Sequence, residues 1–202
     1  MHHHLPNNQC IFTKNMTKKE LRKLYKEKRS AISSKNKMKW DDLMLIQFQQ
    51  FNFNNAQCLF TFWQMEQEPN MYLFTSFLKH RIFNLQIAYP LCDFTTETMQ
   101  AILVNDETVF AENKYGITEP KHGNVLLPNE IDIVFVPLLI CDSKGFRVGY
   151  GKGFYDKFLS QCRKDVIKIG FNYFEPIEKI EDTNKFDIPL DYCITPQKIY
   201  EF

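Results

Sequence analysis

The sequence predicts an α/β protein whose sheet is covered on both faces. Helical and strand-like segments alternate along the chain, which is typical of α/β folds. The near-continuous apolar run from Ile131 to Val136 is typical of a strand that is buried on both faces of a parallel sheet. A chain of 202 residues is long enough for one domain, and no internal repeat or low-complexity linker divides it.

Four helices are predicted. Thr17 and Glu20 match a capping box, in which each side chain satisfies a backbone N–H of the first turn, so a helix is expected over residues 18–32. Ser33 and Ser34 restart the chain into a second helix over residues 35–51. A third helix is predicted over residues 71–81, and a short fourth one over residues 154–162.

Strands are predicted where β-branched and aromatic residues gather. These segments are residues 57–63, 85–89, 99–104, 131–136, 166–171 and 192–195. The second of them is expected to end at Pro90. The fourth, the Ile131 strand, is followed by a glycine-rich loop and then by the short helix. Ligands of open α/β sheets bind beyond the carboxyl ends of strands, so this order favours a binding site at the loop.

Composition limits the kinds of partner. The chain is 44% hydrophobic and 24% charged, and its formal net charge of +1 gives no general attraction to nucleic acid or to an anionic membrane. No run of 18 apolar residues predicts a membrane-spanning helix. The six cysteines form neither a CxxC pair nor a zinc-type cluster, which favours free thiols in the cytoplasm. Residues 1–15 are interpreted as an extension outside a domain of residues 16–202.

The most informative segment runs from Cys141 to Asp156. It holds four of the seven glycines within nine residues, with two cations between them: Gly145, Arg147, Gly149, Gly151, Lys152 and Gly153. Backbone N–H groups without a Cβ in the way can turn towards an anion, and the N-terminus of a helix adds more of them. Together with the carboxylate of Asp156, the segment predicts a polyphosphate site with a metal ion. A flexible surface loop is the plain alternative.

The glycine spacing excludes the two common nucleotide fingerprints. A Walker A loop would need glycine in place of Phe146 and a hydroxyl residue in place of Gly153. A dinucleotide-binding loop that begins at Gly149 would need glycine in place of Phe154. The segment therefore belongs neither to a P-loop NTPase nor to a Rossmann dehydrogenase.

Other side chains are candidates for the same site. Lys18 and Arg22 share one face of the first helix, either as phosphate ligands or as a solvated basic face. Glu66 and Glu68 follow the first strand, where a carboxylate can meet a ligand or simply belong to a turn. One acid of the pair Asp187 and Asp191 can join Asp156 in holding magnesium, or the pair can mark a turn before the last strand. Flat side chains near these segments can stack on a planar ligand or pack in the core: Phe62, Trp63, Phe154 and Tyr155.

The order of these segments resembles the 5-formyltetrahydrofolate cyclo-ligase family, also called 5,10-methenyltetrahydrofolate synthetase, over residues 17–196. The resemblance rests on the glycine segment and on four further runs: Lys18-Lys-Glu-Leu-Arg22, Tyr115-Gly-Ile-Thr-Glu-Pro120, Asp132-Ile-Val-Phe-Val-Pro137 and Asp187-Ile-Pro-Leu-Asp191. The chain departs from the family where Leu138 replaces a common glycine and Phe186 a common histidine.

The resemblance implies a three-layer α/β/α fold in a single domain. It also implies an enzyme that uses ATP and Mg²⁺ to convert 5-formyltetrahydrofolate to 5,10-methenyltetrahydrofolate with release of ADP and phosphate. The formyl oxygen would be phosphorylated, and N10 would then attack the formyl carbon. A monomer in the cytoplasm is expected, with no nucleic acid or membrane partner.

Carried over to this sequence, the resemblance assigns roles to individual residues. Arg147 and Lys152 are the expected catalytic cations, and Asp156 and Asp191 are expected to hold Mg²⁺. The expected ATP ligands are Lys18, Arg22, Arg147, Gly149, Tyr150, Gly151, Lys152, Gly153, Phe154 and Tyr155. The expected folate contacts are Glu68, with Glu66 as the alternative, together with Trp63, Tyr150, Gly151, Lys152, Gly153 and Phe154.

Three other functions stay open. An ATP-dependent phosphotransferase or ligase that acts on another small substrate would need the same glycine loop. A non-catalytic relative would keep a nucleotide or folate site, although the charged candidates are all present. An RNA-binding module is suggested by the lysine-rich first helix and disfavoured by the overall charge balance.

Overall fold

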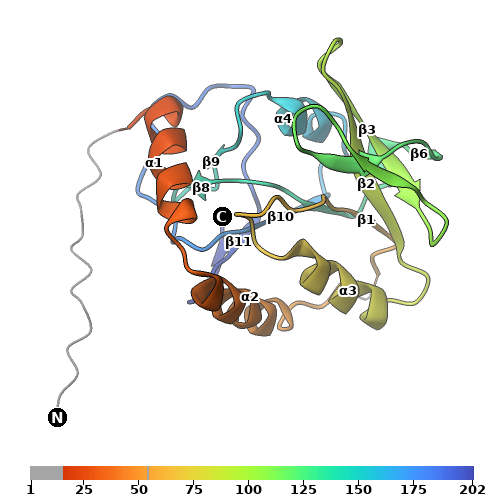
Figure 1. Cartoon of the computed structure of the whole chain (residues 1–202), viewed down its shortest axis with the longest axis horizontal. Helices are drawn as coiled ribbons and strands as arrows, with labels where there is room; N and C mark the ends of the chain where they lie inside the picture. The colour runs from red at the N-terminus through yellow and green to blue at the C-terminus, as the bar shows by residue number, and fades with distance from the viewer. Residues whose placement is uncertain (1–15, 54) are drawn as a thin grey trace.

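The computed structural model describes residues 16–53 and 55–202, so the predicted extension 1–15 lies outside the described residues. An eight-stranded sheet with the order β12-β11-β10-β7-β1-β2-β3-β6 forms its centre (Figure 1). Strands β11, β10, β7, β1 and β2 run parallel, whereas β12, β3 and β6 pair antiparallel at the two edges. The prediction of a mostly parallel central sheet is confirmed.

The elements are short and follow one another closely. The main sheet comprises β1 (Cys58–Phe60), β2 (Gln86–Asp93), β3 (Thr98–Val104), β6 (Val125–Leu126), β7 (Ile133–Phe135), β10 (Ile167–Phe171), β11 (Tyr192–Ile194) and β12 (Ile199–Glu201). Two further two-stranded antiparallel sheets are not part of it. They are formed by β4 (Phe110–Glu112) with β5 (Thr118–Pro120), and by β8 (Ile140–Cys141) with β9 (Arg147–Val148), and each pair is called a ribbon below. The helices are α1 (Lys18–Ser30), α2 (Ser34–Phe48), α3 (Met71–Arg81), the 3₁₀ turn η1 (Pro128–Glu130) and α4 (Phe154–Leu159).

Several predicted boundaries are wrong, among them those of α2, which ends at Phe48 rather than at residue 51, and of β1, which ends at Phe60 rather than at residue 63. Helix α4 ends at Leu159 rather than at residue 162. Strand β2 continues through Pro90 to Asp93, where the prediction had ended it. Strand β1 pairs with β2 only as far as Ala88, so the missing N–H of Pro90 costs no hydrogen bond on that side of the strand.

The parallel strands are buried on both faces because their side chains alternate between two layers. Leu59, Ile133 and Ile169 pack with helices α2 and α3 on one face of the sheet. Phe60 and Val134 face the opposite side, where α4 packs. Figure 1 shows α2 and α3 on one side of the sheet and α4 on the other, which confirms the three-layer arrangement.

Helix α1 packs beside the ribbon of β8 and β9 rather than on the main sheet (Figure 1). Leu21 and Tyr25 of this helix are buried against Ile140 and Val148 of the ribbon. Since the glycine segment begins in this ribbon, α1 brings its basic residues alongside that segment.

Aromatic rings fill the layer between α2, α3 and the sheet. The Phe48 ring lies at the centre, with its centroid 5.3 Å from that of Phe171 and 5.7 Å from that of Phe135. Phe74 of α3 stacks on Phe171 at 3.9 Å between centroids. Ring pairs of this kind stabilise a fold by more than the burial of their apolar area. Phe48 of α2 contacts Phe74 of α3 and Phe135 and Phe171 of the sheet, so it joins both helices to the sheet.

Gly170 of β10 makes room for the side chain of Leu138. A Cβ at position 170 would lie 2.9 Å from Leu138 Cδ2 and 2.8 Å from Leu190 Cδ1. Real Cβ atoms do not approach other atoms this closely, because close-packed interiors leave no space for the overlap. The Leu138 side chain, which follows β7, therefore fits because the neighbouring strand β10 has a glycine at position 170.

We expect Phe48→Ala to lower the free energy of unfolding by about 3–5 kcal/mol, because it removes the central ring of this layer. Ile46→Ala on the same helix is the matched control, since Ile46 is 57% exposed and should cost no more than about 0.5 kcal/mol. Urea titration of both variants measures the difference. Equal losses would mean that α2 is not held by its buried face.

Candidate functional site

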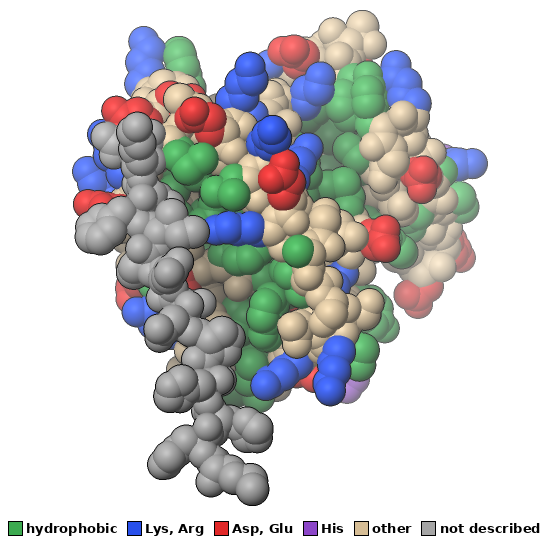
Figure 2. All heavy atoms as spheres, turned by 60° about the vertical axis from the view of Figure 1, so that its left-hand side comes forward, with side chains coloured by type: hydrophobic (Ala, Val, Ile, Leu, Met, Phe, Trp, Pro, Cys, Tyr) green, Lys and Arg blue, Asp and Glu red, His purple; other side chains and the backbone are tan. Residues whose placement is uncertain are grey.

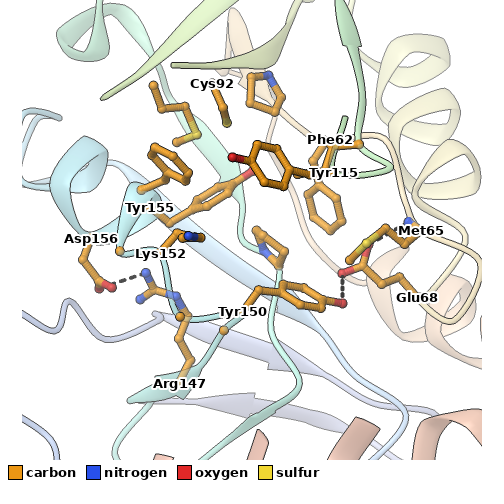
Figure 3. Close-up of a pocket in the computed structure, with 18 of the residues that line it drawn as sticks. Phe62, Met65, Glu68, Cys92, Tyr115, Arg147, Tyr150, Lys152, Tyr155 and Asp156 are labelled. Atoms are coloured by element: carbon orange, nitrogen blue, oxygen red, sulfur yellow. Dashed lines mark hydrogen bonds and ion pairs between the residues drawn. The ribbon is translucent and has the colours of Figure 1, made fainter. Parts of the chain in front are cut away.

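A pocket lies at the carboxyl ends of the adjacent parallel strands β7, β1 and β2, with a cavity volume of about 460 Å³ (Figure 3). Parallel neighbours send the loops that follow them to the same edge of a sheet. The loop after β1 supplies Phe62, Trp63 and Glu68, and the end of β2 supplies Cys92. The chain beyond β7 supplies the glycine segment, so three separate loops form one site.

The pocket has a basic part and an apolar part. The basic part carries the cations Lys18 and Arg22 from α1 and Arg147 and Lys152 from the glycine segment. The apolar part is lined by Phe62, Pro90, Phe94, Met99 and Ile117. In Figure 2, hydrophobic side chains line a hollow in the molecular surface, with Lys and Arg side chains beside it.

The close approach of Arg22 to the loop explains why position 151 is a glycine. Arg22 Nε donates to the carbonyl oxygen of Gly149 at 2.9 Å. A Cβ at position 151 would lie 3.2 Å from Arg22 Cζ, and the φ of Gly151 is +98°, a conformation that other residues rarely adopt. Gly153, with a φ of +72°, turns the chain into α4. The loop thus needs glycine both to turn and to let a guanidinium lie against it.

Arg147, which is buried, and Asp156, which is partly exposed, form an ion pair at the start of α4. Arg147 Nη2 donates to Asp156 Oδ1 at 2.9 Å, and Nη1 donates to the carbonyl oxygen of Ile188. The N–H of Ile188 donates in turn to Asp156 Oδ1 at 3.0 Å. Burial lowers the pKa of Arg147, an effect that the negative charge of Asp156 opposes. These bonds join the glycine segment to the chain that leads into β11.

The other cations of the pocket differ in how they are held. Lys18 Nζ lies 2.6 Å from Asp187 Oδ1, so a second ion pair ties α1 to the segment before β11. Lys152 is exposed, and none of the ion pairs or hydrogen bonds found among residues 16–53 and 55–202 involves its side chain. Its ammonium group therefore lies at the pocket without an internal counter-ion.

Glu68 lies on the floor of the pocket and is 2% exposed. The hydroxyl of Tyr150 donates to Glu68 Oε1 at 2.7 Å, and the N–H of Met65 donates to Oε2 at 2.8 Å (Figure 3). Burial raises the pKa of Glu68, and these hydrogen bonds oppose the rise. Of the two glutamates that the sequence suggested, Glu68 lines the pocket, and Glu66 is not among the residues that do.

The structure brings most of the sequence-predicted residues to this one pocket. Lys18, Arg22, Trp63, Glu68 and every residue predicted between Arg147 and Asp156 line it. Asp191 does not: its Oδ2 accepts from the N–H of Lys168 at 2.7 Å and lies 2.8 Å from Lys168 Nζ, beside a separate hollow at the start of β11. Asp187 is the acid of this segment that lines the pocket.

Part of the apolar wall was not predicted from the sequence. Tyr115, Ile117 and Thr118 come from the ribbon of β4 and β5, whose only sequence signal is the run from Tyr115 to Pro120. Glu119 of this ribbon anchors it, because its carboxylate accepts from the N–H of Cys92 at 3.1 Å and from Asn113 Nδ2 at 3.0 Å. A buried acid thus fixes one wall of the pocket to β2.

The donor set limits how a metal ion can be held. Within the described part of the chain, no three His, Cys, Asp or Glu side chains gather closely enough to form a metal site of their own. Mg²⁺ commonly takes one or two carboxylates and completes its shell with water and substrate phosphates, so Asp156 and Asp187 at the pocket suit it. No helix of the described residues is long and apolar enough to cross a membrane.

Fold and pocket together define a class of α/β protein with a basic, glycine-rich cradle beside an apolar cavity at the carboxyl edge of its sheet. The profile of the 5-formyltetrahydrofolate cyclo-ligase family matches residues 14–196. The chain belongs to this family.

Individual relatives agree with this assignment. The 5-formyltetrahydrofolate cyclo-ligase of Haemophilus influenzae is 37% identical over 110 residues, which are 52% of this chain and 57% of that protein. The match thus spans little more than half of that relative. The enzyme of the same name from Mycoplasma pneumoniae is 28% identical over 185 residues, which cover 90% of this chain and all of that protein.

Two solved structures share the fold. The NMR structure of Aquifex aeolicus 5,10-methenyltetrahydrofolate synthetase superimposes with a TM-score of 0.76 at 24% identity and covers 92% of this chain and 93% of that one. A 5,10-methenyltetrahydrofolate synthetase from Mycoplasma pneumoniae gives a TM-score of 0.71 at 24% identity, with 90% and 99% of the two chains covered.

We expect Glu68→Gln to raise the melting temperature of the free protein at about pH 7.5. A raised folded-state pKa means that the ionised carboxyl costs stability at neutral pH, a cost that disappears as the pH falls and the carboxyl is protonated. The difference between variant and wild type should therefore shrink at about pH 4. Melting curves at both pH values measure it. A variant that melts lower at neutral pH would show that the ionised form is favoured by the fold.

Proposed function

We propose that this chain catalyses the ATP-dependent cyclisation of 5-formyltetrahydrofolate to 5,10-methenyltetrahydrofolate, with release of ADP and phosphate. The observation that carries the proposal is the meeting of a basic glycine loop and an apolar cavity in one pocket. A phosphorylated nucleotide suits the first, and a planar pterin suits the second. We place the reaction in the cytoplasm, where thiols such as those of the buried, free Cys141 and Cys193 stay reduced.

The phosphates of ATP would lie along the glycine segment. Backbone N–H groups from Gly149 to Gly153 can turn towards phosphate oxygens, as in other anion-binding loops. Arg22 and Lys18 approach this segment from α1, and Lys152 lies within it without an internal counter-ion. Four cations, with Arg147, thus surround the position of a polyphosphate.

The folate would occupy the apolar part of the pocket. Trp63 is 46% exposed, and its ring centroid lies 5.2 Å from that of Phe110. Phe110 thus packs near the indole ring, whose exposed part can stack on a planar ligand. Phe62 and Phe154 line the same cavity and can contact a planar ring. Glu68 on the floor is the carboxylate that can accept from N–H groups of a pterin.

The chemistry needs positioning and charge neutralisation. The formyl oxygen attacks the γ-phosphorus as the bond from that phosphorus to the oxygen of ADP breaks. N10 of the same folate molecule then attacks the formyl carbon and loses its proton, and the carbon–oxygen bond breaks to release phosphate, which can take up that proton. Holding the two substrates in contact makes the first step intramolecular in effect, and the second step already takes place within one molecule. The fixed guanidinium of Arg147 and the ammonium of Lys152 stabilise the charge that spreads over the transferring phosphoryl oxygens.

The acids of the pocket can hold the magnesium ion that the proposed reaction would use. Asp156 would hold the ion, with Asp187 as the second carboxylate of the pocket, because Asp191 lies beside Lys168 instead. When bound, Mg²⁺ would neutralise phosphate charge, as in other phosphoryl transfers. Asp156 also accepts from Arg147, so the same side chain orients a cation of the chain itself.

The direct test is a near-ultraviolet absorbance assay for the methenyl product with purified protein, Mg-ATP and 5-formyltetrahydrofolate. Product should form only when ATP is present and should stop forming when Mg²⁺ is chelated. Absence of product while calorimetry still detects ATP binding would keep the nucleotide half of the proposal and overturn the folate half. Absence of both would mean a relative that has lost the activity.

We expect Lys152→Ala to lower kcat by about 100-fold or more, because it removes a cation that would act on the phosphoryl group. Its melting temperature should stay unchanged, since Lys152 is exposed and forms no ion pair with the described residues. Lys157→Ala is the matched control: this lysine of α4 pairs with Glu97 at 2.9 Å, and both side chains are exposed. Steady-state kinetics should show wild-type turnover for the control. Equal turnover in both variants would remove Lys152 from the mechanism.

A further inference from the structure

Tyr155 carries a buried hydroxyl that has no hydrogen-bond partner among residues 16–53 and 55–202. Buried hydroxyls are nearly always hydrogen-bonded, because an unpaired one has lost its hydrogen bonds to water without forming new ones. The other orphaned polar atoms of the described chain belong to Arg29, Asn70 and Asn172, and none of these residues lines the pocket. Tyr155 does line it, and this combination singles it out.

The ring of Tyr155 packs near the sheet, and the residue belongs to the lining of the pocket. Tyr155 follows Phe154 at the start of α4, and its ring centroid lies 6.1 Å from that of Phe60 on the sheet. Figure 3 shows the side chain reaching from α4 into the pocket, on the side of Cys92 and Phe62. The hydroxyl oxygen itself has almost no exposed surface in the free protein, so a ligand would reach it by displacing a neighbouring side chain of the pocket lining.

The surroundings of the hydroxyl suit a neutral ligand group. Phe62, Pro90 and Met99 line this part of the pocket and offer no side-chain hydrogen bond. The polar neighbours that act on the hydroxyl electrostatically are Cys92, Glu68 and Arg147. Glu68 already accepts from Tyr150, and Arg147 already donates to Asp156.

Burial keeps this hydroxyl protonated. The loss of water around it raises the pKa of Tyr155 well above its ordinary value. At neutral pH the hydroxyl therefore offers one donor and can also accept. A carbonyl oxygen, ring nitrogen or amino group at the edge of a planar ring matches these properties. The anionic oxygens of a polyphosphate are matched better by the cations of the glycine segment and of α1.

We infer that the Tyr155 hydroxyl binds the polar edge of the planar ring of the second substrate, and not the phosphates of ATP. This inference rests on the proposed function, which supplies a pterin as that ring. It moves Tyr155 from the nucleotide ligands, where the resemblance placed it, to the residues that select the second substrate. The hydroxyl, which has no partner in the described part of the free protein, would then form its hydrogen bond with the ligand.

Tyr155→Phe tests the inference, because it removes one oxygen and keeps the ring. Binding of 5-formyltetrahydrofolate, measured by calorimetry without ATP, should weaken about 10-fold or more, the effect of losing one hydrogen bond to a buried ligand group. Binding of Mg-ATP should stay unchanged. The melting temperature of the free variant should equal or exceed that of the wild type, because the lost hydroxyl had no partner to lose.

Two further tyrosines serve as controls. Tyr173 also has a buried hydroxyl, but it donates to Asp41 Oδ1 at 2.8 Å, so Tyr173→Phe should melt lower than the wild type. Tyr72 on α3 is 70% exposed, so Tyr72→Phe should change neither melting temperature nor binding. The pair separates the loss of a satisfied hydroxyl from the loss of an exposed one.

Each other outcome decides against the inference. A Tyr155→Phe variant that melts lower, as Tyr173→Phe does, would show that the hydroxyl has a partner in the free protein. Weakened Mg-ATP binding would assign the hydroxyl to the phosphates, and unchanged 5-formyltetrahydrofolate binding would remove it from the site. Failure of the proposed function would give a different result, because the wild type itself would then bind Mg-ATP but not 5-formyltetrahydrofolate. In that case the pterin would also be rejected as the ligand of Tyr155.

Discussion

The pairing of β1 with a parallel neighbour on each side determines where the site lies. Leu59 pairs with Ile133 of β7 and with Ile87 of β2, so the three strands run level with one another. Their side chains at this level all face the layer of α2 and α3. A shift by one residue in any of these strands would turn apolar side chains to the wrong layer. The same register that buries the core therefore makes three loops leave the sheet together and form the pocket.

Two of the four cations of the pocket are paired with acids before any ligand arrives. Lys18 is paired with Asp187, Arg147 with Asp156, and the guanidinium of Arg22 lies on a backbone carbonyl oxygen. Removing charges from water is costly unless partners compensate, and these acids serve that purpose in the free protein. They also hold the segment before β11 against both α1 and the glycine loop. The same side chains thus line the pocket and hold these segments of the fold together.

The sequence predicted the elements that carry a strong local signal. The capping box of α1 is present, with the N–H of Thr17 donating to Glu20 Oε2 at 2.8 Å. Apolar runs located the parallel strands, and the cluster of glycines located the loop that lines the pocket. Strands β4, β5, β8 and β9 were not predicted, because two or three residues are too few to show an alternating pattern.

Other features depend on how distant segments meet. The placement of Asp191 follows from its position at the start of β11, next to Lys168 of β10, and the spacing from Asp187 does not reveal it. Continuation of β2 past Pro90 depends on where β1 stops. The unpaired hydroxyl of Tyr155 is a property of the cavity around it. Local sequence thus gave the groups of the site, and tertiary structure gave their partners.

The position of α1 has a consequence for how the protein is made. This helix comes near the beginning of the chain, yet Arg22 contacts Gly149, Lys18 contacts Asp187 and Arg29 contacts Leu138. On the ribosome the amino-terminal helix therefore waits, with Leu21 and Tyr25 uncovered, until the last third of the chain emerges. The basic part of the pocket can therefore form only after the glycine segment and Asp187 have been synthesised.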